Sequence, residues 1–285
     1  MKIGIIGAGR TGVALGYVLR TKGFKVVAIA SRRQSSLDAA KTYIGPDCLY
    51  TLDNNLAVQM ADIVAVTTQD REIKNVAAQI AAVPGRLDGK LFFHTSGAHA
   101  ASELSPLDGK GALLGSLHPL QTFPDIAAGI RDLPSAYIFI EGAEKALPAL
   151  KELASSIGVD VVVIESSHKM LYHVSAVFVC NLLTALLYAG EGVMGRIGIG
   201  LDPFYPIIRA TLGNIEAKGP LLSLTGPVVR GDAGTVSSHL EAIRDMPLHR
   251  RIYKSLSLAA LEMARKRGTA TEEQIAGIRR LLEEE

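Results

Sequence analysis

The residues with the clearest chemical meaning stand near the N-terminus, where three glycines follow a short apolar run. The segment Gly7-Ala8-Gly9-Arg10-Thr11-Gly12 has the spacing GxGxxG between an expected strand and an expected helix. Gly7 permits a tight turn, Gly9 lets a pyrophosphate approach the backbone, and Gly12 lets the helix pack closely on the sheet. Phosphates then lie at the positive end of the helix. The pattern predicts a dinucleotide site; the alternative is a glycine-rich turn without a nucleotide.

The end of the second expected strand indicates which dinucleotide binds. NAD usually needs an acidic side chain there, because a carboxylate accepts hydrogen bonds from the adenosine ribose. This strand ends instead in Ser31-Arg32-Arg33, and a hydroxyl with two guanidiniums can surround a dianionic 2′-phosphate. We therefore predict NADP(H), with Arg32 as the direct contact; one arginine of the pair could instead be a solvated loop charge. Thr67 and Thr68, at the end of the fourth expected strand, complete the predicted cofactor-binding set.

Other catalytic arrangements are missing from the sequence. The seven histidines are scattered, and His168 and His173 stand five residues apart, not the four that would place two ligands on one helical face. Cys48 and Cys180 form no metal-type spacing, so we predict no metal site. There is also no nucleophile elbow and no P-loop lysine. Hydride transfer needs none of these groups, because a bound nicotinamide supplies the chemistry.

Several segments resemble one known superfamily. They are Gly7–Gly12, His94–Ala98, Gly115–Phe123, the helix that begins at Lys169, and Leu224–Asp232. Together they resemble the 6-phosphogluconate dehydrogenase and pyrroline-5-carboxylate reductase superfamily over almost the whole chain. More narrowly, the chain is similar to a branch of Rossmann-like NADP oxidoreductases whose C-terminal helical domain has no known function, and which includes proteins named by analogy with deazaflavin-dependent NADP reductases. The resemblance implies a Rossmann domain, a helical dimerisation domain and a homodimer.

Two polar side chains are expected at the ligand crevice of the sheet. Ser96 follows the fifth expected strand, so its hydroxyl can donate to a substrate or carboxamide oxygen. Alternatively, Ser96 caps a turn and His94 packs in the interior. The segment Gly115–Pro119 is similar to the GxHP segment of prephenate dehydrogenases, which implies that His118 faces the same crevice. A structural histidine before proline is the alternative.

Lys169 and His173 stand four residues apart at the start of a long helix, so both can point into one cleft. The spacing is similar to the K-x-x-x-N of the β-hydroxyacid dehydrogenases, in which the lysine is the general acid/base and the asparagine binds substrate. Here His173 takes the asparagine position, which leaves the substrate class open. The resemblance implies a catalytic Lys169; the alternative is a lysine that ends an apolar helix with its ammonium in water.

A last candidate segment lies in the C-terminal half. By resemblance to the pyrroline-5-carboxylate reductases, the turn Thr225–Asp232 reaches toward the cleft of a partner subunit. Arg230 could then bind an anionic substrate or a cofactor phosphate, with Asp232 beside it. The alternative is that Arg230 pairs with Asp232 or another acid and only holds the connection between helices.

These residues favour an NADP(H)-dependent oxidoreductase that moves hydride to or from a small carbonyl or imine. Lys169, assisted by His173 or His118, would supply or remove the balancing proton. Hydride exchange with a flavin or deazaflavin is an alternative that needs no strong acid at Lys169. A protein that only senses NADP(H) is another alternative, although polar residues such as Ser96 beside the nicotinamide favour an enzyme. An intact glycine pattern disfavours a structural dimer with a relic site.

The elements that must position these residues follow from hydrophobic periodicity. Strands are expected at 2–6, 25–30, 49–51, 62–67, 90–95, 113–117, 137–141 and 160–164, and helices at 12–21, 35–43, 72–82 and 144–157. Strands that alternate with helices predict an α/β fold, with a mostly parallel Rossmann-type sheet covered on both faces. From His168 onward the sequence reads as helices only. We therefore predict a Rossmann domain over residues 1–165 and a helical substrate and dimerisation domain over 166–285.

One segment, Met170–Gly190, has no Asp, Glu, Lys or Arg and is long enough to cross a bilayer. It contains polar residues such as Asn181 and Thr184, and we expect it to be a central helix buried between two subunits. The formal net charge is +2, with no long block of one sign, which gives no reason to propose a nucleic acid or a membrane as partner. The two distant cysteines and the lack of a visible export signal lead us to expect a cytoplasmic protein. We expect it to be a homodimer that acts on a small molecule.

Overall fold

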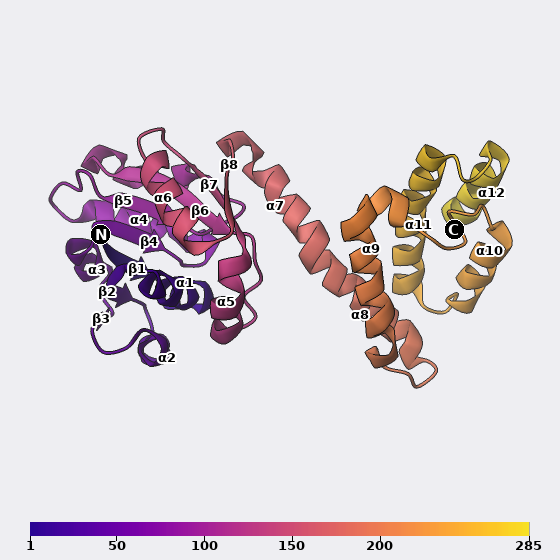
Figure 1. Cartoon of the computed structure of the whole chain (residues 1–285), viewed down its shortest axis with the longest axis horizontal. Helices are drawn as coiled ribbons and strands as arrows, with labels where there is room; N and C mark the ends of the chain where they lie inside the picture. Colours follow the sequence, from indigo (N-terminus) through magenta and orange to yellow (C-terminus); the bar gives the residue numbers. More distant parts are fainter. Residues whose placement is uncertain (285) are drawn as a thin grey trace. The chain divides into compact units, whose positions relative to one another are not determined.

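The computed structural model describes residues 1–284. Its first part is built on one eight-stranded sheet with the order β3-β2-β1-β4-β5-β6-β7-β8 (Figure 1). The strands are β1 (Lys2–Ile6), β2 (Lys25–Ala30), β3 (Leu49–Thr51), β4 (Ile63–Val66), β5 (Leu91–His94), β6 (Leu113–Pro119), β7 (Tyr137–Gly142) and β8 (Asp160–Val163). All neighbouring strands are parallel except β6 and β7. The predicted mostly parallel Rossmann-type sheet is confirmed.

Helices cover both faces of this sheet because both faces of its strands are apolar. In β4, for example, Ile63 and Ala65 face one core and Val64 and Val66 face the other. The helices are α1 (Arg10–Thr21), α2 (Gln34–Ile44), α3 (Asn54–Met60), α4 (Ile73–Ala82), α5 (Ile126–Asp132) and α6 (Leu147–Ile157). Buried residues of α1, α2 and α6 belong to the first core, and those of α3 and α4 belong to the second. This packing holds the carboxyl ends of β1, β4, β5 and β6 along one edge of the sheet.

The predicted strands and helices of this part agree with the observed ones to within a few residues. Apart from short 3₁₀ turns, three elements were not predicted: α3, α5, and a longer 3₁₀-helical segment, η2 (Ala101–Lys110). Both α-helices have only seven residues, too few for the apolar period to stand out. Pro106 interrupts the third segment.

After β8 the described chain is helical. The elements are α7 (Lys169–Val177), a π-helical turn η5 (Phe178–Leu182), α8 (Leu183–Gly195), α9 (Tyr205–Ser223), α10 (Ala233–Ala242), α11 (Pro247–Arg267) and α12 (Glu272–Glu283). Short 3₁₀ turns η1 (Asp70–Glu72), η3 (Leu133–Ser135), η4 (Ser166–His168) and η6 (Asp202–Phe204) join other elements. Internal contacts divide the chain into two compact units, Met1–Val177 and Phe178–Glu285. The division falls inside the long apolar helix, and the domain boundary near residue 165 stays a prediction.

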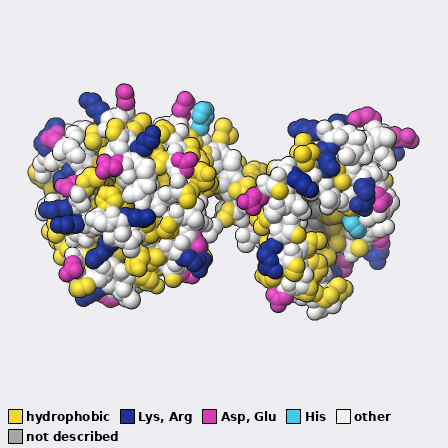
Figure 2. Space-filling model, viewed as in Figure 1, with side chains coloured by type: hydrophobic (Ala, Val, Ile, Leu, Met, Phe, Trp, Pro, Cys, Tyr) yellow, Lys and Arg dark blue, Asp and Glu magenta, His cyan; other side chains and the backbone are white. Residues whose placement is uncertain are grey.

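The second unit has its own small core, formed where α10, α11 and α12 meet. Its buried residues include Val236, Leu261 and Ile278. The long helix is different, because none of its most apolar stretch within Ser166–Gly195 is buried in the chain. Its length and mean hydropathy of 1.8 would also allow a membrane span, which is weak support because core helices of soluble proteins meet the same test. Figure 2 shows hydrophobic side chains on the surface over α8 and α9.

Candidate functional site

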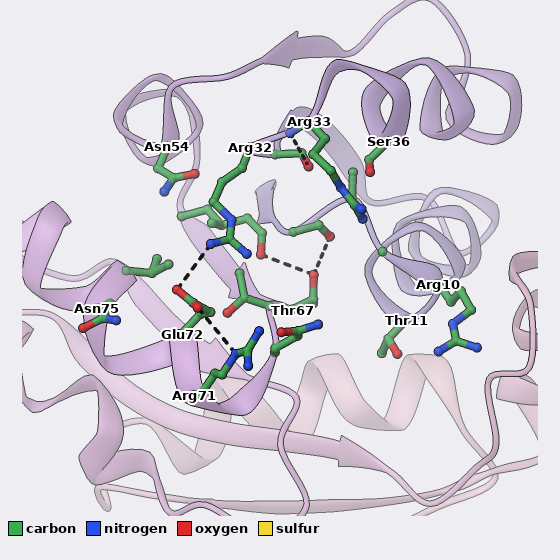
Figure 3. Close-up of a pocket in the computed structure, with 18 of the residues that line it drawn as sticks. Arg10, Thr11, Arg32, Arg33, Ser36, Asn54, Thr67, Arg71, Glu72 and Asn75 are labelled. Carbon is green, nitrogen blue, oxygen red and sulfur yellow. Dashed lines mark hydrogen bonds and ion pairs between the residues drawn. The ribbon is translucent and has the colours of Figure 1, made fainter.

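A cavity of about 680 Å³ lies at the carboxyl ends of β1, β2 and β4 in the first unit. Figure 3 shows the residues that line it. They include these residues of the predicted cofactor set: Gly7, Gly9, Arg10, Thr11, Ser31, Arg32, Arg33, Thr67 and Thr68. The volume lies in the usual range for small-molecule sites. The structure therefore brings the glycine turn and the arginine pair, which are far apart in sequence, to one cavity.

The glycine turn has the geometry that a dinucleotide requires. Gly7 has φ +117°, which favours glycine. A Cβ at Gly12 would stand 2.1 Å from the Gly7 carbonyl oxygen, so only glycine lets α1 begin this close to the turn. At Gly9, by contrast, a Cβ would meet nothing within 4 Å and would project into the cavity. Gly9 thus leaves open the space that a pyrophosphate would take.

Thr67 and Thr68 have different roles. The Thr67 hydroxyl donates to the Gly7 carbonyl at 2.7 Å, so it supports the glycine turn from behind. Thr68 Oγ1 is buried in the cavity wall without a hydrogen-bond partner among the described residues. A buried hydroxyl without a partner is costly unless a ligand or water satisfies it. Together with the uncapped N-terminus of α1, where Gly9 is the N-cap and the first turn has no acid, it fits a bound phosphate ester.

The adenosine end of the cavity carries more charge than the sequence indicated. Arg32 and Arg33 line it as predicted, and the backbone amide of Arg33 donates to Ser31 Oγ at 3.5 Å. Arg71 and Glu72, from η1 after β4, lie opposite them. Glu72 bridges two guanidiniums, at 3.5 Å from Arg32 Nη1 and 3.7 Å from Arg71 Nε (Figure 3). The second strand has no carboxylate, as predicted, but the cavity receives one from another element.

A second set of polar side chains lies in one row across three neighbouring strands. The register places His94 of β5 opposite Ser116 of β6, and Ser116 opposite Glu141 of β7. Opposed residues of neighbouring strands share one face of the sheet, so the three side chains lie in one row on that face. Ser116 Oγ donates to Glu141 Oε2 at 3.1 Å. All three side chains are buried.

Lys169, at the start of α7, completes this row. Its side chain is only 2% exposed, which contradicts the alternative of an ammonium in water. Nζ donates to Ser116 Oγ at 2.8 Å and to the Ser96 carbonyl at 3.0 Å. Burial lowers the pKa of Lys169 to about 8, although Glu141 and Asp70 oppose this effect. Lys169 is therefore an ammonium whose proton can leave near neutral pH.

Glu141 forms hydrogen bonds that hold this row of polar side chains in place, and it was not predicted from the sequence. Besides Ser116, its carboxylate accepts hydrogen bonds from the backbone amide of Ala101 at 2.8 Å and from Ser166 Oγ at 2.5 Å. Four elements are thereby joined at one carboxylate. The sequence signal was weak, because Glu141 was read only as the last residue of an apolar strand.

His118 and His173 both lie next to Gly97. A Cβ built on Gly97 would stand 2.8 Å from His118 Nε2 and 3.0 Å from His173 Nδ1. His118 Nδ1 is 2.6 Å from the Tyr172 hydroxyl, whose ring stacks on Phe139. His173 Nδ1 is buried and has no partner among the described residues. The four predicted catalytic residues, Ser96, His118, Lys169 and His173, thus lie in one group within the first unit.

The pKa of His118 is lowered to about 3, mainly by burial and further by Lys169, His173 and His94. The imidazole is therefore neutral at physiological pH. Burial also raises the pKa of Tyr172, so its hydroxyl keeps its proton. If that proton is donated to His118 Nδ1, Nε2 carries the other proton and is a donor beside Gly97.

Ser96 and His94 adopt the arrangement stated above as the structural alternative. Ser96 Oγ accepts hydrogen bonds from the amides of Ala98 and His99, and so caps a turn. His94 Nδ1 accepts from the Ser96 amide and Nε2 lies 2.9 Å from the Ala100 carbonyl. Burial lowers the pKa of His94 to about 4. Its contribution is to hold the turn that presents the Ser96 carbonyl to Lys169.

Arg230 and Asp232 lie in the second unit. Asp232 is the N-cap of α10 and accepts hydrogen bonds from both the amide and the hydroxyl of Thr235, at 2.9 and 2.6 Å. Arg230 is exposed and forms no ion pair within 4 Å among residues 1–284. A pairing of Arg230 with Asp232 is therefore not observed. The role of Arg230 in a substrate site stays a prediction.

Comparisons with known protein families match two parts of the chain. Residues 1–119 match a Rossmann-like domain, and residues 136–260 match a domain of unknown function, DUF2520. A search of curated protein sequences found no match.

Solved structures are similar over most of the chain. A provisionally assigned NADP oxidoreductase from Bacteroides fragilis is 25% identical with a TM-score of 0.76, covering 92% of this chain and 98% of its own. A Thermotoga maritima protein is 23% identical with a TM-score of 0.72, covering 94% and 100%. A reductive aminase from Aspergillus terreus, in complex with NADPH and ethyl levulinate, is 14% identical with a TM-score of 0.69, covering 97% and 98%. At the last two identities the likeness shows the fold alone.

The predicted resemblance is thus confirmed on two independent grounds, the domain matches and the structural neighbours. The chain thus combines a Rossmann-like match over residues 1–119 with a DUF2520 match over residues 136–260.

Proposed function

We propose that this protein is an NADP(H)-dependent oxidoreductase that moves hydride between the cofactor and a small carbonyl or imine compound. The observation that carries the proposal is one sheet edge with two features. A glycine turn suited to a phosphate opens into an arginine-rich cavity, and further along the same edge a buried Lys169 lies near His118, whose burial lowers its pKa and keeps its imidazole neutral. The first feature suits a dinucleotide, and the second suits a substrate that must exchange a proton.

Residues that line the cavity would bind different parts of the cofactor. Gly9 and the N-terminus of α1 would hold the pyrophosphate, and Ser31 with Arg32 and Arg33 would hold the 2′-phosphate. When bound, the nicotinamide supplies or accepts the hydride. Thr68 has a free hydroxyl in the cavity wall for a further contact.

Lys169 and His118 would act on the substrate. Two of the three N–H groups of Lys169 are directed to Ser96 and Ser116, which leaves the third for a substrate oxygen or nitrogen. Lys169 donates a proton to that atom as hydride arrives at the neighbouring carbon, or removes it in the reverse direction. His118, kept neutral, would donate a hydrogen bond from Nε2 to the same polar bond. His173, which also lies next to Gly97, would contact the substrate through Nδ1.

Support for the substrate class comes from the chemistry of this group, and the neighbouring structures support the fold. These include the reductive aminase with NADPH and an imine reductase from Aspergillus terreus in complex with NADPH4 and dibenz[c,e]azepine. Their identity of 14% restricts them to support for the fold.

The cofactor is tested by calorimetric titration with NADPH and NADH. We expect tighter binding of NADPH, by about 1.5–3 kcal/mol for each charge-assisted contact to the 2′-phosphate. In the double variant Ser31→Asp, Arg32→Ala this preference should fall or reverse. Equal affinity of the unmodified protein for both nucleotides would remove the argument for NADP(H).

The reaction is tested by NADPH oxidation against a panel of keto acids, imines and flavins. With the active compound, Lys169→Met should retain NADPH affinity and lower turnover by roughly 10²–10⁴-fold, the usual scale of general acid catalysis. Full activity of the variant with a flavin would support hydride exchange instead. NADPH binding without turnover of any compound would support a sensor.

A further inference from the structure

Glu72 is the one carboxylate among the charged side chains that line the cofactor cavity; the others are Arg10, Arg32, Arg33 and Arg71. Glu72 lies on η1, and its carboxylate contacts two of these arginines, Arg32 and Arg71 (Figure 3). From this geometry we infer that Glu72 is a specificity-determining residue. It is the counter-ion that a 2′-phosphate must displace from Arg32 and Arg71, and it thereby limits the preference for NADP(H) over NAD(H). The inference rests on the proposed function and specifies its cofactor selectivity.

The position of Glu72 follows from the chain around it. It is the last residue of η1 and the N-cap of α4, but its side chain caps no amide of that helix. Its carboxylate therefore has only the two guanidiniums as charged partners within 4 Å among residues 1–284. The Glu72 side chain is 25% exposed, whereas those of Arg32 and Arg71 are 75% and 78% exposed. Glu72 is thus the more buried member of this group, and Arg32 and Arg71 are more exposed and have more room to change position.

The charges of Glu72 and the arginines determine how Glu72 affects binding of the 2′-phosphate. A 2′-phosphate is a dianion and binds most strongly to cations that no other anion neutralises. Arg33 forms no ion pair within 4 Å in the described chain, so it is available to the phosphate at once. Arg32 must exchange one anion for another. A 2′-phosphate bound to Arg32 would also be repelled by the neighbouring Glu72, an effect that NADH, with a ribose hydroxyl in place of the phosphate, would not experience.

The test compares nucleotides that differ only in the 2′-phosphate. NADPH and NADH, and adenosine 2′,5′-bisphosphate and AMP, are titrated by calorimetry into the unmodified protein, Glu72→Gln and a matched control, Asp88→Asn. Asp88 pairs with Arg86 on the same domain but outside the cofactor cavity. Glutamine keeps the size of Glu72 and removes its charge.

In Glu72→Gln we expect the affinity for NADPH and for the bisphosphate to rise about two- to fivefold, the scale of one partly exposed charge pair. The affinities for NADH and AMP should change less than twofold, and Asp88→Asn should change none. In the double variant Glu72→Gln, Arg32→Gln the gain should be largely lost, because it depends on freeing Arg32.

An unchanged or lowered ratio of NADPH to NADH affinity in a folded Glu72→Gln variant would overturn the inference and leave the proposed function intact. Failure of the unmodified protein to bind either dinucleotide would overturn both. Circular dichroism and the thermal midpoint of each variant show whether the fold is retained.

Discussion

At the scale of single residues, the main finding is a buried Lys169 held by a carbonyl and a hydroxyl rather than by a carboxylate in direct contact. The groups that face it are Glu141 of β7, Asp70 of η1, and the imidazoles of His94 and His118. The acids raise the pKa of Lys169, but burial exceeds their effect and the result is about 8. This balance is typical of functional lysines.

The lowered pKa makes a prediction about stability. The unfolded chain binds a proton at Lys169 up to about pH 10.5 and the folded chain only up to about pH 8, so the free energy of unfolding contributed by Lys169 should rise between these values. The rise should not exceed roughly 3 kcal/mol. Urea unfolding measures the free energy of unfolding of the unmodified protein and of Lys169→Met from pH 7.5 to 10.5. The difference between the two proteins gives the contribution of Lys169.

The comparison with Lys169→Met is needed because Cys48 acts in the opposite direction. Burial raises the pKa of its thiol to about 11, so its contribution falls as pH rises from about 9 to 11. This effect is common to both proteins and cancels. A flat difference across the pH range would show that Lys169 is not desolvated as described.

Gly97 gives a second prediction at this scale. A methyl group at Gly97 would stand 2.8 Å from His118 Nε2 and 3.0 Å from His173 Nδ1, in the space proposed for the substrate. Gly97→Ala should lower kcat/KM at least tenfold while the NADPH dissociation constant stays within about twofold, since Gly97 does not line the cofactor cavity. Gly109→Ala, where a Cβ meets nothing within 4 Å, is the control. Unchanged kcat/KM in Gly97→Ala would place the substrate elsewhere.

At the scale of elements, Glu141 joins β7 to β6, η2 and η4 through three hydrogen bonds. Such a network is stabilising only while every member has a partner. The same carboxylate also lies at the end of the row that holds Lys169. Stability and the position of the proposed acid therefore depend on one side chain.

We expect Glu141→Ala to lower the free energy of unfolding by about 3–5 kcal/mol, because it leaves buried donors and Lys169 without compensation. Glu141→Gln keeps the shape and one of the two acceptor oxygens and should cost less, about 1–2 kcal/mol. Urea unfolding with a fitted slope measures both. Equal and small losses would mean that water replaces the carboxylate.

At the scale of the whole molecule, the long helix poses the main question. Many of its apolar side chains are exposed in the single chain, including Val179, Leu182 and Leu186, which lie near one helical face. Exposed apolar surface of this kind is typical of an interface. We expect a two-fold dimer, and the cytoplasmic location stays a prediction.

Light scattering on the purified protein tests the dimer. A dimer is expected, and the double variant Val179→Glu, Leu186→Glu should be monomeric, because two buried carboxylates without partners would destabilise an apolar interface. Val159→Glu, a charge placed at an exposed apolar residue of the first unit, should remain dimeric. Recovery of the protein only from membranes would favour the span instead. A detergent-free monomer would exclude both.

A shared site is a separate proposal about the same assembly. If Arg230 acts in the partner's site, co-refolding Lys169→Met with Arg230→Ala protomers should form one intact site in each heterodimer. Random pairing then recovers about a quarter of the activity of the unmodified protein. Each variant must first be shown to be folded and inactive alone. No recovery from confirmed heterodimers would place Arg230 in the same subunit's site or make it structural.

Much of the fold and half of the candidate site could be predicted from the sequence because their signals are local. Strands such as β1 and β2 are continuous apolar runs, and the glycine turn is six consecutive residues between a strand and a helix. The arginines after β2 adjoin that turn through a fixed βαβ unit. These features depend on neighbours in the chain and hence on side-chain type and backbone conformation alone.

Only the tertiary structure decided the rest. Arg71 and Glu72 reach the cofactor cavity because β4 lies beside β1, and Glu141 meets Ser116 because β7 turns antiparallel at that register. Neither strand order nor the direction of an individual strand leaves a mark on hydrophobic periodicity, since buried strands look alike in either direction. Lys169 could be recognised by its spacing to His173, but its burial, and with it the lowered pKa, arises from contacts with residues more than fifty positions away.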